Sequence, residues 1–259
     1  MNRFAIVGCG KMGQALAAGM IPKLKCECVC CDVADAALQN IKNLIGDKAI
    51  YTKDLAKVAD NCDVILLAVK PAHAPKVLDI IKNGTHKTIL SIVAGITHAQ
   101  LQQMAPTHEV VRIMPNTPAL VGAGAIVIYD SNLSEQNRNM IQDLFENTGF
   151  VHFVPDEGMM DAVTGLSGSG PALFAIMAEA LADAAVAQGL TRNLAAALAR
   201  ETMLGTAKLL ENQHPDILKE AVMSPGGTTA AGIIAAESAG FRAATQAFVT
   251  AATLKSRNI

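Results

Sequence analysis

A short segment late in the chain carries the residues best suited to binding a small anion. It reads Ser224, Pro225, Gly226, Gly227, Thr228 and Thr229, and an apolar helical run follows it directly. Glycines free the backbone, and the first N–H groups of a helix attract negative charge. The segment therefore predicts a cradle for a small anion at a helix N-terminus. A second glycine-rich segment, residues 165–171, predicts another loop of the same kind.

The N-terminal region contains a glycine pattern typical of dinucleotide binding. It reads Gly8, Cys9, Gly10, Lys11, Met12 and Gly13, and it stands between an apolar strand pattern and a helical pattern. In such a loop the first glycine makes a tight turn, the second lets a pyrophosphate approach the backbone, and the third lets the helix pack on the strand. A plain glycine turn is the alternative, and the flanking strand and helix favour the nucleotide site. A nucleotide loop and an anion cradle in one chain indicate an enzyme.

Asp32 ends the second predicted strand, near the position where such folds place a ribose-binding acid, roughly 20 residues beyond the loop. A carboxylate there bonds the 2′-hydroxyl of NADH and repels the 2′-phosphate of NADPH. Asp35 follows it, and no Lys or Arg occurs before Lys42. We therefore expect NADH to be preferred over NADPH. The alternative is a solvated acid at a strand end.

The composition fits a folded protein of one large or two modest domains. Of the 259 residues, 51% are hydrophobic and 17% are charged, which argues against disorder. The formal net charge is −2 and no Lys/Arg cluster occurs, so we expect no nucleic-acid partner. No apolar run reaches the ~20 residues that span a bilayer, and the chain begins as a strand rather than as a signal peptide. We therefore expect no membrane partner.

Four of the six cysteines lie close together, at Cys26, Cys28, Cys30 and Cys31. Zinc ligands usually have about two to four residues between them and are completed by a second pair elsewhere, whereas these cysteines have one residue between them or none. A buried strand explains the cluster better, because free cysteine is a good small apolar residue. We expect no metal site, and the free thiols favour a reducing cytoplasm.

The first part of the chain alternates apolar strand patterns with helical patterns. This predicts an α/β fold whose N-terminal domain is a Rossmann-type, mostly parallel sheet covered on both faces. Strands are expected over residues 4–7, 26–31, 64–69, 88–93, 110–113 and 125–129, with helices over residues 12–20 and 34–45. Pro71 is expected to stop the third of these strands. We place the dinucleotide-binding domain at residues 1–154.

The patterns after residue 155 predict helices alone. They are expected over residues 172–188, 192–211, 217–222, 229–238 and 241–257, with Gly189 ending the first and Thr191 capping the second. The first is apolar nearly all round apart from Glu179 and Asp183, so it is buried or packs against a partner. We therefore predict that residues 155–259 form an all-helical domain for dimerisation and substrate binding.

Six segments, taken in order, resemble pyrroline-5-carboxylate reductase over nearly the whole chain. They are residues 8–13, 68–71, 93–95, 112–118, 165–171 and 224–229, of which the last two are the most specific. The resemblance implies reduction of L-1-pyrroline-5-carboxylate to L-proline with NADPH or NADH, the last step of proline synthesis. It also implies a Rossmann domain and a helical domain that interlocks in a homodimer, with dimers assembling into rings such as a decamer. The active site would lie between domains and include the partner's helices.

The resemblance also implies roles for particular residues. Thr229 is the catalytic group that bonds the ring nitrogen of the substrate. The substrate-binding residues are Ser224, Gly226, Gly227, Thr228, Thr229 and Glu157. The cofactor-binding residues are the six of the glycine loop and Asp32, Ala68, Val69, Lys70, Pro71, Ala94, Gly95, Met114, Pro115 and Asn116. For Lys70 a solvated lysine, for Asn116 simple turn chemistry, and for Glu157 a helix-start charge are the alternatives.

Two positions depart from the family pattern, and two other classes of protein compete with it. Asp32 stands where many members carry Ser, Asn or Arg and prefer NADPH, and Ala221 stands where some have an amide near the cofactor. A β-hydroxyacid dehydrogenase would need Lys and Asn where this chain has Phe174 and Ala178. A non-catalytic NAD-sensing protein is the remaining alternative, and the intact residues 224–229 argue against it.

Overall fold

The computed structural model describes residues 1–84 and 88–258, and it divides into two compact units. The first unit comprises Met1–Ser169 together with residues 251–258, and the second is Gly170–Thr250. Each unit is described by itself. The predicted domain boundary at residues 154 and 155 stays a prediction.

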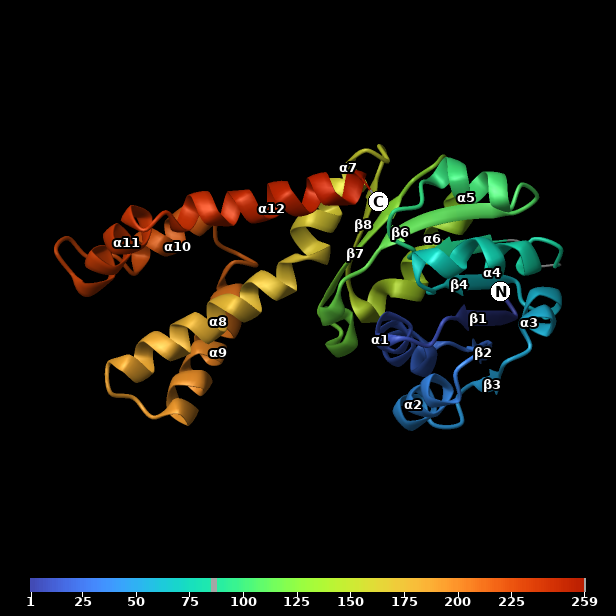
Figure 1. Ribbon diagram of the computed structural model, residues 1–259, viewed down its shortest axis with the longest axis horizontal. Coiled ribbons are helices and arrows are strands. Elements are labelled where there is room, and N and C mark those ends of the chain that lie inside the picture. Colours follow the sequence, from blue (N-terminus) through green and yellow to red (C-terminus); the bar gives the residue numbers. More distant parts are fainter. Residues whose placement is uncertain (85–87, 259) are drawn as a thin grey trace. The chain divides into compact units, whose positions relative to one another are not determined.

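The first unit is built on one eight-stranded sheet (Figure 1). Its strands are β1 (Arg3–Val7), β2 (Glu27–Cys31), β3 (Ile50–Thr52), β4 (Val64–Leu67), β5 (Thr88–Ser91), β6 (Glu109–Met114), β7 (Gly124–Tyr129) and β8 (Gly149–Val154). They lie in the order β3-β2-β1-β4-β5-β6-β7-β8, and only the β6–β7 pair is antiparallel among the strands described. The predicted mostly parallel sheet is confirmed.

Helices cover both faces of this sheet. They are α1 (Lys11–Met20), α2 (Asp35–Ile45), α3 (Leu55–Asn61), α4 (Ala74–Ile81), α5 (His98–Met104), α6 (Glu135–Phe145) and α7 (Met159–Val163). Short turns of helix join them: η1 (Ile21–Lys23), η2 (Pro71–His73), η3 (Thr117–Val121), η4 (Glu146–Thr148) and η5 (Thr164–Gly168).

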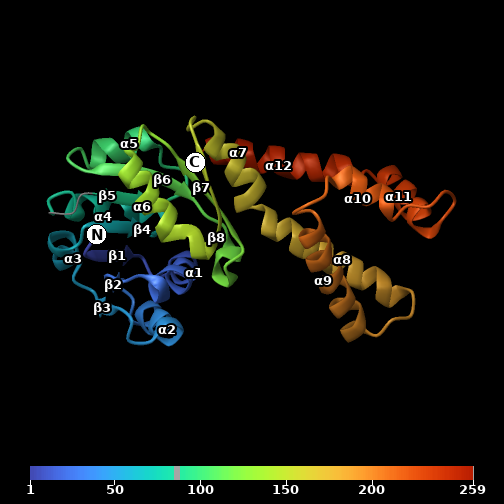
Figure 2. The same ribbon diagram turned by 180° about the vertical axis from the view of Figure 1, so that it is seen from behind.

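Strand β1 shows why the sheet is buried on both sides. Phe4 and Ile6 pack in the core shared with α1, α2 and α6, the last of which is seen in front of the sheet in Figure 2. Ala5 and Val7 pack in the core shared with α3, α4 and α5. Successive side chains of a strand point to opposite faces, so a sheet covered twice needs apolar residues at every position. This requirement produces the continuous apolar runs seen in the sequence.

The second unit consists of helices, as predicted. They are α8 (Gly170–Ala187), α9 (Arg192–Leu209), α10 (Pro215–Ala221), α11 (Thr228–Ser238) and α12 (Phe241–Arg257), whose last residues belong to the first unit. Helices α8 and α9 pack together through three buried alanines, Ala182, Ala195 and Ala199. Large apolar side chains of both helices remain exposed, among them Phe174 and Leu198. A chain with so small a core in this unit needs a further surface to cover these side chains.

Several details differ from the sequence-based expectations. Strands β3 and β8 were missed. Strand β3 has three residues and lies at the sheet edge, and β8 lies where the alternation of strand and helix patterns ends in the sequence. Residues 165–171 do not form a loop: they lie in the π-turn η5 and the first turn of α8, and the Ser169 N–H donates to the Thr164 carbonyl (2.9 Å). Thr191 stands at the N-cap of α9, yet no capping bond from its side chain is found within the described chain.

The expected absence of any membrane-length apolar segment also needs correction. The helical stretch Met159–Ala187 is long and apolar enough to cross a membrane by length and composition, and an 18-residue window within it has mean hydropathy 1.5. Polar and charged residues, among them Glu179 and Asp183, interrupt its apolar run but not its helix, so counting uninterrupted runs missed it. One such stretch is weak evidence for a membrane span, since an interface helix passes the same test.

Candidate active site

The glycine loop joins β1 to α1 with a geometry that requires glycine at its ends. Gly8 has φ +101°, and a Cβ there would lie 2.6 Å from the carbonyl carbon of Ala68. A Cβ at Gly13 would lie 2.0 Å from the Gly8 carbonyl oxygen. Side chains at these two positions would therefore push the helix off the strand and open the loop. The predicted roles of the first and third glycines agree with this packing.

The space in front of the loop fits the pyrophosphate of a dinucleotide. A Cβ at Gly10 would meet nothing within 4 Å, and no side chain in the described ranges caps the N-terminus of α1. The free N–H groups of that first turn carry the positive end of the helix dipole. A cavity of about 350 Å³ opens here. Its lining residues include six predicted cofactor residues: Gly8, Gly10, Asp32, Ala68, Val69 and Lys70.

Asp32 is fixed by two backbone hydrogen bonds. Its Oδ2 accepts from the Cys9 N–H (2.7 Å) and its Oδ1 accepts from the Ala34 N–H (2.9 Å). The carboxylate therefore holds the glycine loop against the end of β2 as well as lining the cavity. This positioning role is not visible in the sequence, because it depends on the loop and the strand lying side by side.

Lys53 was missed by the sequence analysis. It directly follows β3 and lines the same cavity as Asp32. No Lys or Arg occurs between Asp32 and Lys42 in the sequence, but β3 pairs with β2 and brings Lys53 beside the end of β2.

The remaining predicted cofactor residues have more varied settings. Strand β4 ends at Leu67, before Pro71, so Pro71 begins the turn η2 and does not stop the strand. The strand ends where its neighbour β1 turns away at Gly8. Gly95 has φ +75° and lies in the turn after β5, together with Ala94. These turns, like the glycine loop, follow the carboxyl ends of parallel strands, where open α/β sheets bind ligands.

Asn116 serves the local backbone. Its Nδ2 donates to the Ser167 carbonyl (3.1 Å) and its Oδ1 accepts from the Ala125 N–H (2.8 Å). Met114, two residues earlier, packs on the π-turn, since a Cβ at Gly168 would lie 2.5 Å from its Cε. Residues 114–116 thus tie the end of β6 to the π-turn. None of these three residues lines the cavity at the glycine loop.

Glu157 forms a largely buried ion pair. Its Oε1 accepts from Arg112 Nη1 (2.8 Å) and from the His98 N–H (2.5 Å). The side chains of Arg112 and Glu157 are 9% and 24% exposed. Arg112 therefore depends on this carboxylate for its charge balance, a role that sequence reasoning missed because the two residues are far apart in the chain.

The predicted anion cradle lies in the second unit and has the expected local form. Helix α11 begins at Thr228 with Gly227 as its N-cap, and no capping side chain occurs in the described part of the chain. Gly226 has φ +70°, and the Gly227 N–H closes a turn on the Ser224 carbonyl (3.0 Å). The first N–H groups of α11 are therefore available to an anion, with the Thr228 and Thr229 side chains at the same helix start.

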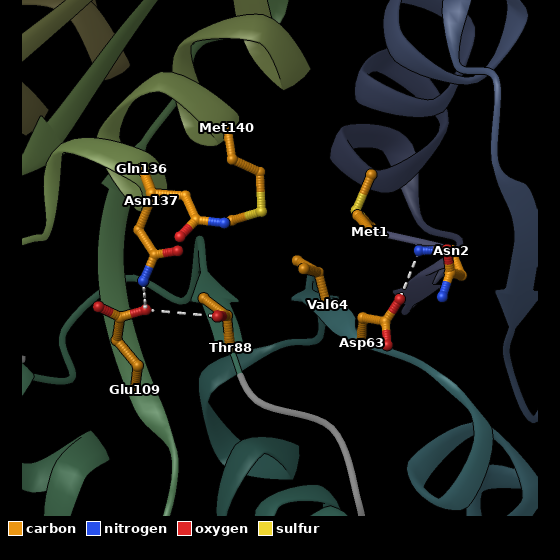
Figure 3. A pocket seen from close by; sticks show the side chains of 9 residues that line it. All are labelled: Met1, Asn2, Asp63, Val64, Thr88, Glu109, Gln136, Asn137 and Met140. Atoms are coloured by element: carbon orange, nitrogen blue, oxygen red, sulfur yellow. Dashed lines mark hydrogen bonds between the residues drawn. The ribbon is translucent and has the colours of Figure 1, made fainter.

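A larger cavity of about 590 Å³ lies elsewhere in the first unit (Figure 3). It is found at the amino ends of the strands, the opposite edge of the sheet from the glycine loop. Glu109 there accepts from Thr88 Oγ1 (3.3 Å) and Asn137 Nδ2 (2.5 Å), and Asp63 accepts from the N–H groups of Asn2 and Arg3. Both acids therefore already accept hydrogen bonds from neighbouring protein groups.

The Cys9 and Cys31 thiols near the site are protonated at neutral pH. The Cys9 thiol is hydrogen bonded to Cys30 and buried, which raises its pKa far above the usual value. Burial raises the pKa of the Cys31 thiol to about 11. Cys28 and Cys30 pack on one face of the sheet and Cys31 on the other, as the buried-strand interpretation requires. Thiolate chemistry is therefore absent from this loop at neutral pH.

Comparisons with known proteins agree with this arrangement. Residues 157–259 match the family model for pyrroline-5-carboxylate reductase dimerisation, and residues 3–95 match that for NADP oxidoreductase, coenzyme F420-dependent. The chain is 36% identical to pyrroline-5-carboxylate reductase of Arabidopsis thaliana, over 99% of this chain and 95% of that protein. The chain belongs to the pyrroline-5-carboxylate reductase family. It is an NAD(P)H-dependent oxidoreductase of proline biosynthesis with a C-terminal dimerisation domain.

Further relatives of this reductase family extend the agreement. The Synechocystis enzyme is 43% identical over 80% of this chain and 78% of its own. The solved pyrroline carboxylate reductase of Plasmodium falciparum, with NADP bound, has a TM-score of 0.88 and 30% identity, covering 99% of this chain and 97% of that chain. The Coxiella burnetii structure has a TM-score of 0.89 and 30% identity over 98% and 97%. The dimerisation model also covers the whole of the apolar stretch Met159–Ala187.

Proposed function

We propose that this reductase reduces L-1-pyrroline-5-carboxylate to L-proline, with the substrate carboxylate bound at the start of α11. The observation that carries the proposal is the uncapped N-terminus of α11, preceded by Gly226 with φ +70° and the turn closed on Ser224. Backbone N–H groups and the helix dipole stabilise a carboxylate at such a position. Residues 226–229 thereby orient the substrate for the reaction.

Thr229 is proposed to hold the ring nitrogen of the substrate through its hydroxyl. Gly8, Gly10 and Asp32 would hold a dinucleotide whose nicotinamide, when bound, would supply the hydride for the C=N carbon. A protonated imine is already electrophilic, so the protein needs no strong general acid. Catalysis by this chain then rests on orientation and on electrostatics. Glu157 is proposed as an acid near the substrate, and its ion pair with Arg112 fixes its position.

The cofactor is proposed to bind at the glycine loop, with NADH preferred. Support comes from the loop geometry, from the uncapped α1 and from Asp32 at the end of β2. A carboxylate at this place accepts from a ribose 2′-hydroxyl and repels a 2′-phosphate. The residues after β4 and in the turns around Gly95 and Pro115 are proposed to lie toward the nicotinamide.

The assembly is proposed to be a homodimer through the C-terminal helices that forms larger rings, in a reducing cytoplasm. The exposed apolar side chains of α8 and α9 support the dimer, because they have little else to pack against in their own unit. The free cysteines of the sheet support the reducing compartment.

Two variants of Thr229 test the proposal at its active group. Thr229→Ala should lower kcat/KM for pyrroline-5-carboxylate by about 10–100-fold, the effect of one hydrogen bond to a charged group. Thr229→Ser keeps the hydroxyl and should stay within about fivefold of the parent. The dissociation constant for NADH should be unchanged in both. Equal activity of Thr229→Ala and the parent would remove the hydroxyl from the mechanism.

A further inference from the structure

Lys53 and Asp32 occupy equivalent places on neighbouring strands. Strands β2 and β3 run parallel with Cys31 opposite Thr52, and the Asp32 N–H donates to the Thr52 carbonyl (3.3 Å). Asp32 is the first residue after β2, and Lys53 is the first residue after β3. Both therefore leave the sheet at its carboxyl edge, on the same side of the glycine loop. Both line the cavity of about 350 Å³ in front of that loop.

The two side chains differ in how firmly they are held. Both oxygens of Asp32 accept backbone hydrogen bonds, from Cys9 and Ala34. The Lys53 ammonium lies 2.7 Å from the carboxylate of Asp35, and the two side chains are 51% and 86% exposed. An ion pair this exposed is weak and exchanges readily. Lys53 is thus a cation that can leave its partner for a stronger anion.

The sheet order decides which part of a dinucleotide Lys53 would meet. In folds of this type the acid after the second strand marks the ribose that carries the 2′-position. Strand β3 lies beyond β2 on that side, whereas Lys70 follows β4 on the other side of β1. Lys53 therefore belongs to the adenosine side of the loop and Lys70 to the opposite side.

We infer that Lys53 is a specificity-determining residue that binds the 2′-phosphate of NADPH, exchanging the carboxylate of Asp35 for the phosphate. The inference rests on the proposed binding of the cofactor at the glycine loop. A phosphate monoester carries more charge than a carboxylate and offers three acceptor oxygens, so the exchange favours the phosphate. Asp32 favours NADH and Lys53 favours NADPH. The reductase accordingly accepts both cofactors, and the Lys53–Asp35 pair sets how strongly Asp32 favours NADH over NADPH.

Binding of cofactor fragments tests the inference without catalysis. Isothermal titration would compare adenosine 2′,5′-bisphosphate with 5′-AMP on the full-length protein. Lys53→Met should weaken the bisphosphate by about tenfold, the loss of one charge-assisted contact, and 5′-AMP by less than about twofold. Lys57→Met is the matched control, because Lys57 pairs with Asp54 on the exposed surface of α3 and does not line the cavity. It should leave both affinities unchanged.

Asp35→Asn supplies the opposite change. Removing this carboxylate frees Lys53 and removes a negative charge, so binding of the bisphosphate should tighten by about threefold while 5′-AMP is unaffected. Equal weakening of both fragments in Lys53→Met, or no change in either, would overturn the inference. Failure of the parent protein to reduce pyrroline-5-carboxylate would refute the proposed function. The ratio of the affinities for the bisphosphate and 5′-AMP would remain a separate test of Lys53.

Discussion

Replacing Glu157 by Gln should destabilise the sheet unit, because it leaves the Arg112 guanidinium buried without a counter-charge. Arg112 is 9% exposed and its Nη1 lies 2.8 Å from Glu157 Oε1. Removing one partner of a fully buried pair costs about 3–5 kcal/mol. Glu157 is 24% exposed, so water can reach the site and we expect about 2–3 kcal/mol. Thermal unfolding at fixed protein concentration should show a melting temperature lower by about 5–10 °C.

A double-mutant cycle separates this ion pair from other effects of the substitution. Arg112→Met with Glu157→Gln removes both charges, and its loss of stability should be smaller than the sum of the two single losses. Glu27→Gln is the matched control, since Glu27 is 42% exposed and pairs with Arg3 at the surface. That control should cost less than about 1 kcal/mol in the free energy of unfolding.

The result for Glu157 also decides between its two proposed roles. A Glu157→Gln protein of unchanged stability and strongly reduced kcat/KM would refute the ion-pair reasoning and leave an acid that acts on the substrate alone. Lower stability with little change in kcat/KM would leave Glu157 with a structural role only. Both effects together are what the present account predicts, because the carboxylate is held by Arg112 and is proposed to lie near the substrate.

Two further predictions concern the cofactor and the thiols. Asp32→Ser should shift the ratio of kcat/KM values toward NADPH by about tenfold, the value of one lost charge interaction with the 2′-phosphate, and an unchanged ratio would make Asp32 a bystander. It should also weaken both cofactors, since the Cys9 N–H loses its acceptor. Burial raises the pKa values of Cys31 and Cys62 to about 11, from 9. Their contribution to stability is therefore complete below pH 9 and is lost as pH rises toward 11, which urea unfolding at pH 8 and pH 10.5 would measure; equal stability at both would contradict it. At pH 8 the native protein should react with a charged thiol reagent at Cys26, the half-buried thiol, and at all six after unfolding.

The sequence was sufficient for the parts of the fold that depend on periodicity and on glycine geometry. Residues 4–7 read as a strand buried on both faces because every position is apolar, and the loop that follows has glycine where backbone contacts exclude a Cβ. The start of α11 was predicted for a similar reason, since Gly226 and Gly227 stand where a helix begins.

Features that depend on pairing between distant segments escaped the sequence analysis. The position of Lys53 follows from the register between β2 and β3, and β3 has only three residues at a sheet edge. The ion pair of Arg112 with Glu157 joins residues whose proximity no local pattern encodes. The π-turn over residues 164–168 was predicted as a loop because its glycines suggest turns, whereas Gly168 is small so that Met114 can pack on it.

The proposed reaction is best tested by steady-state oxidation of NADH and NADPH by the purified protein with pyrroline-5-carboxylate. We expect oxidation that depends on the substrate, forms proline, occurs with both cofactors and is faster with NADH. A folded protein that binds NADH and yields no proline with either cofactor would refute the proposed reaction.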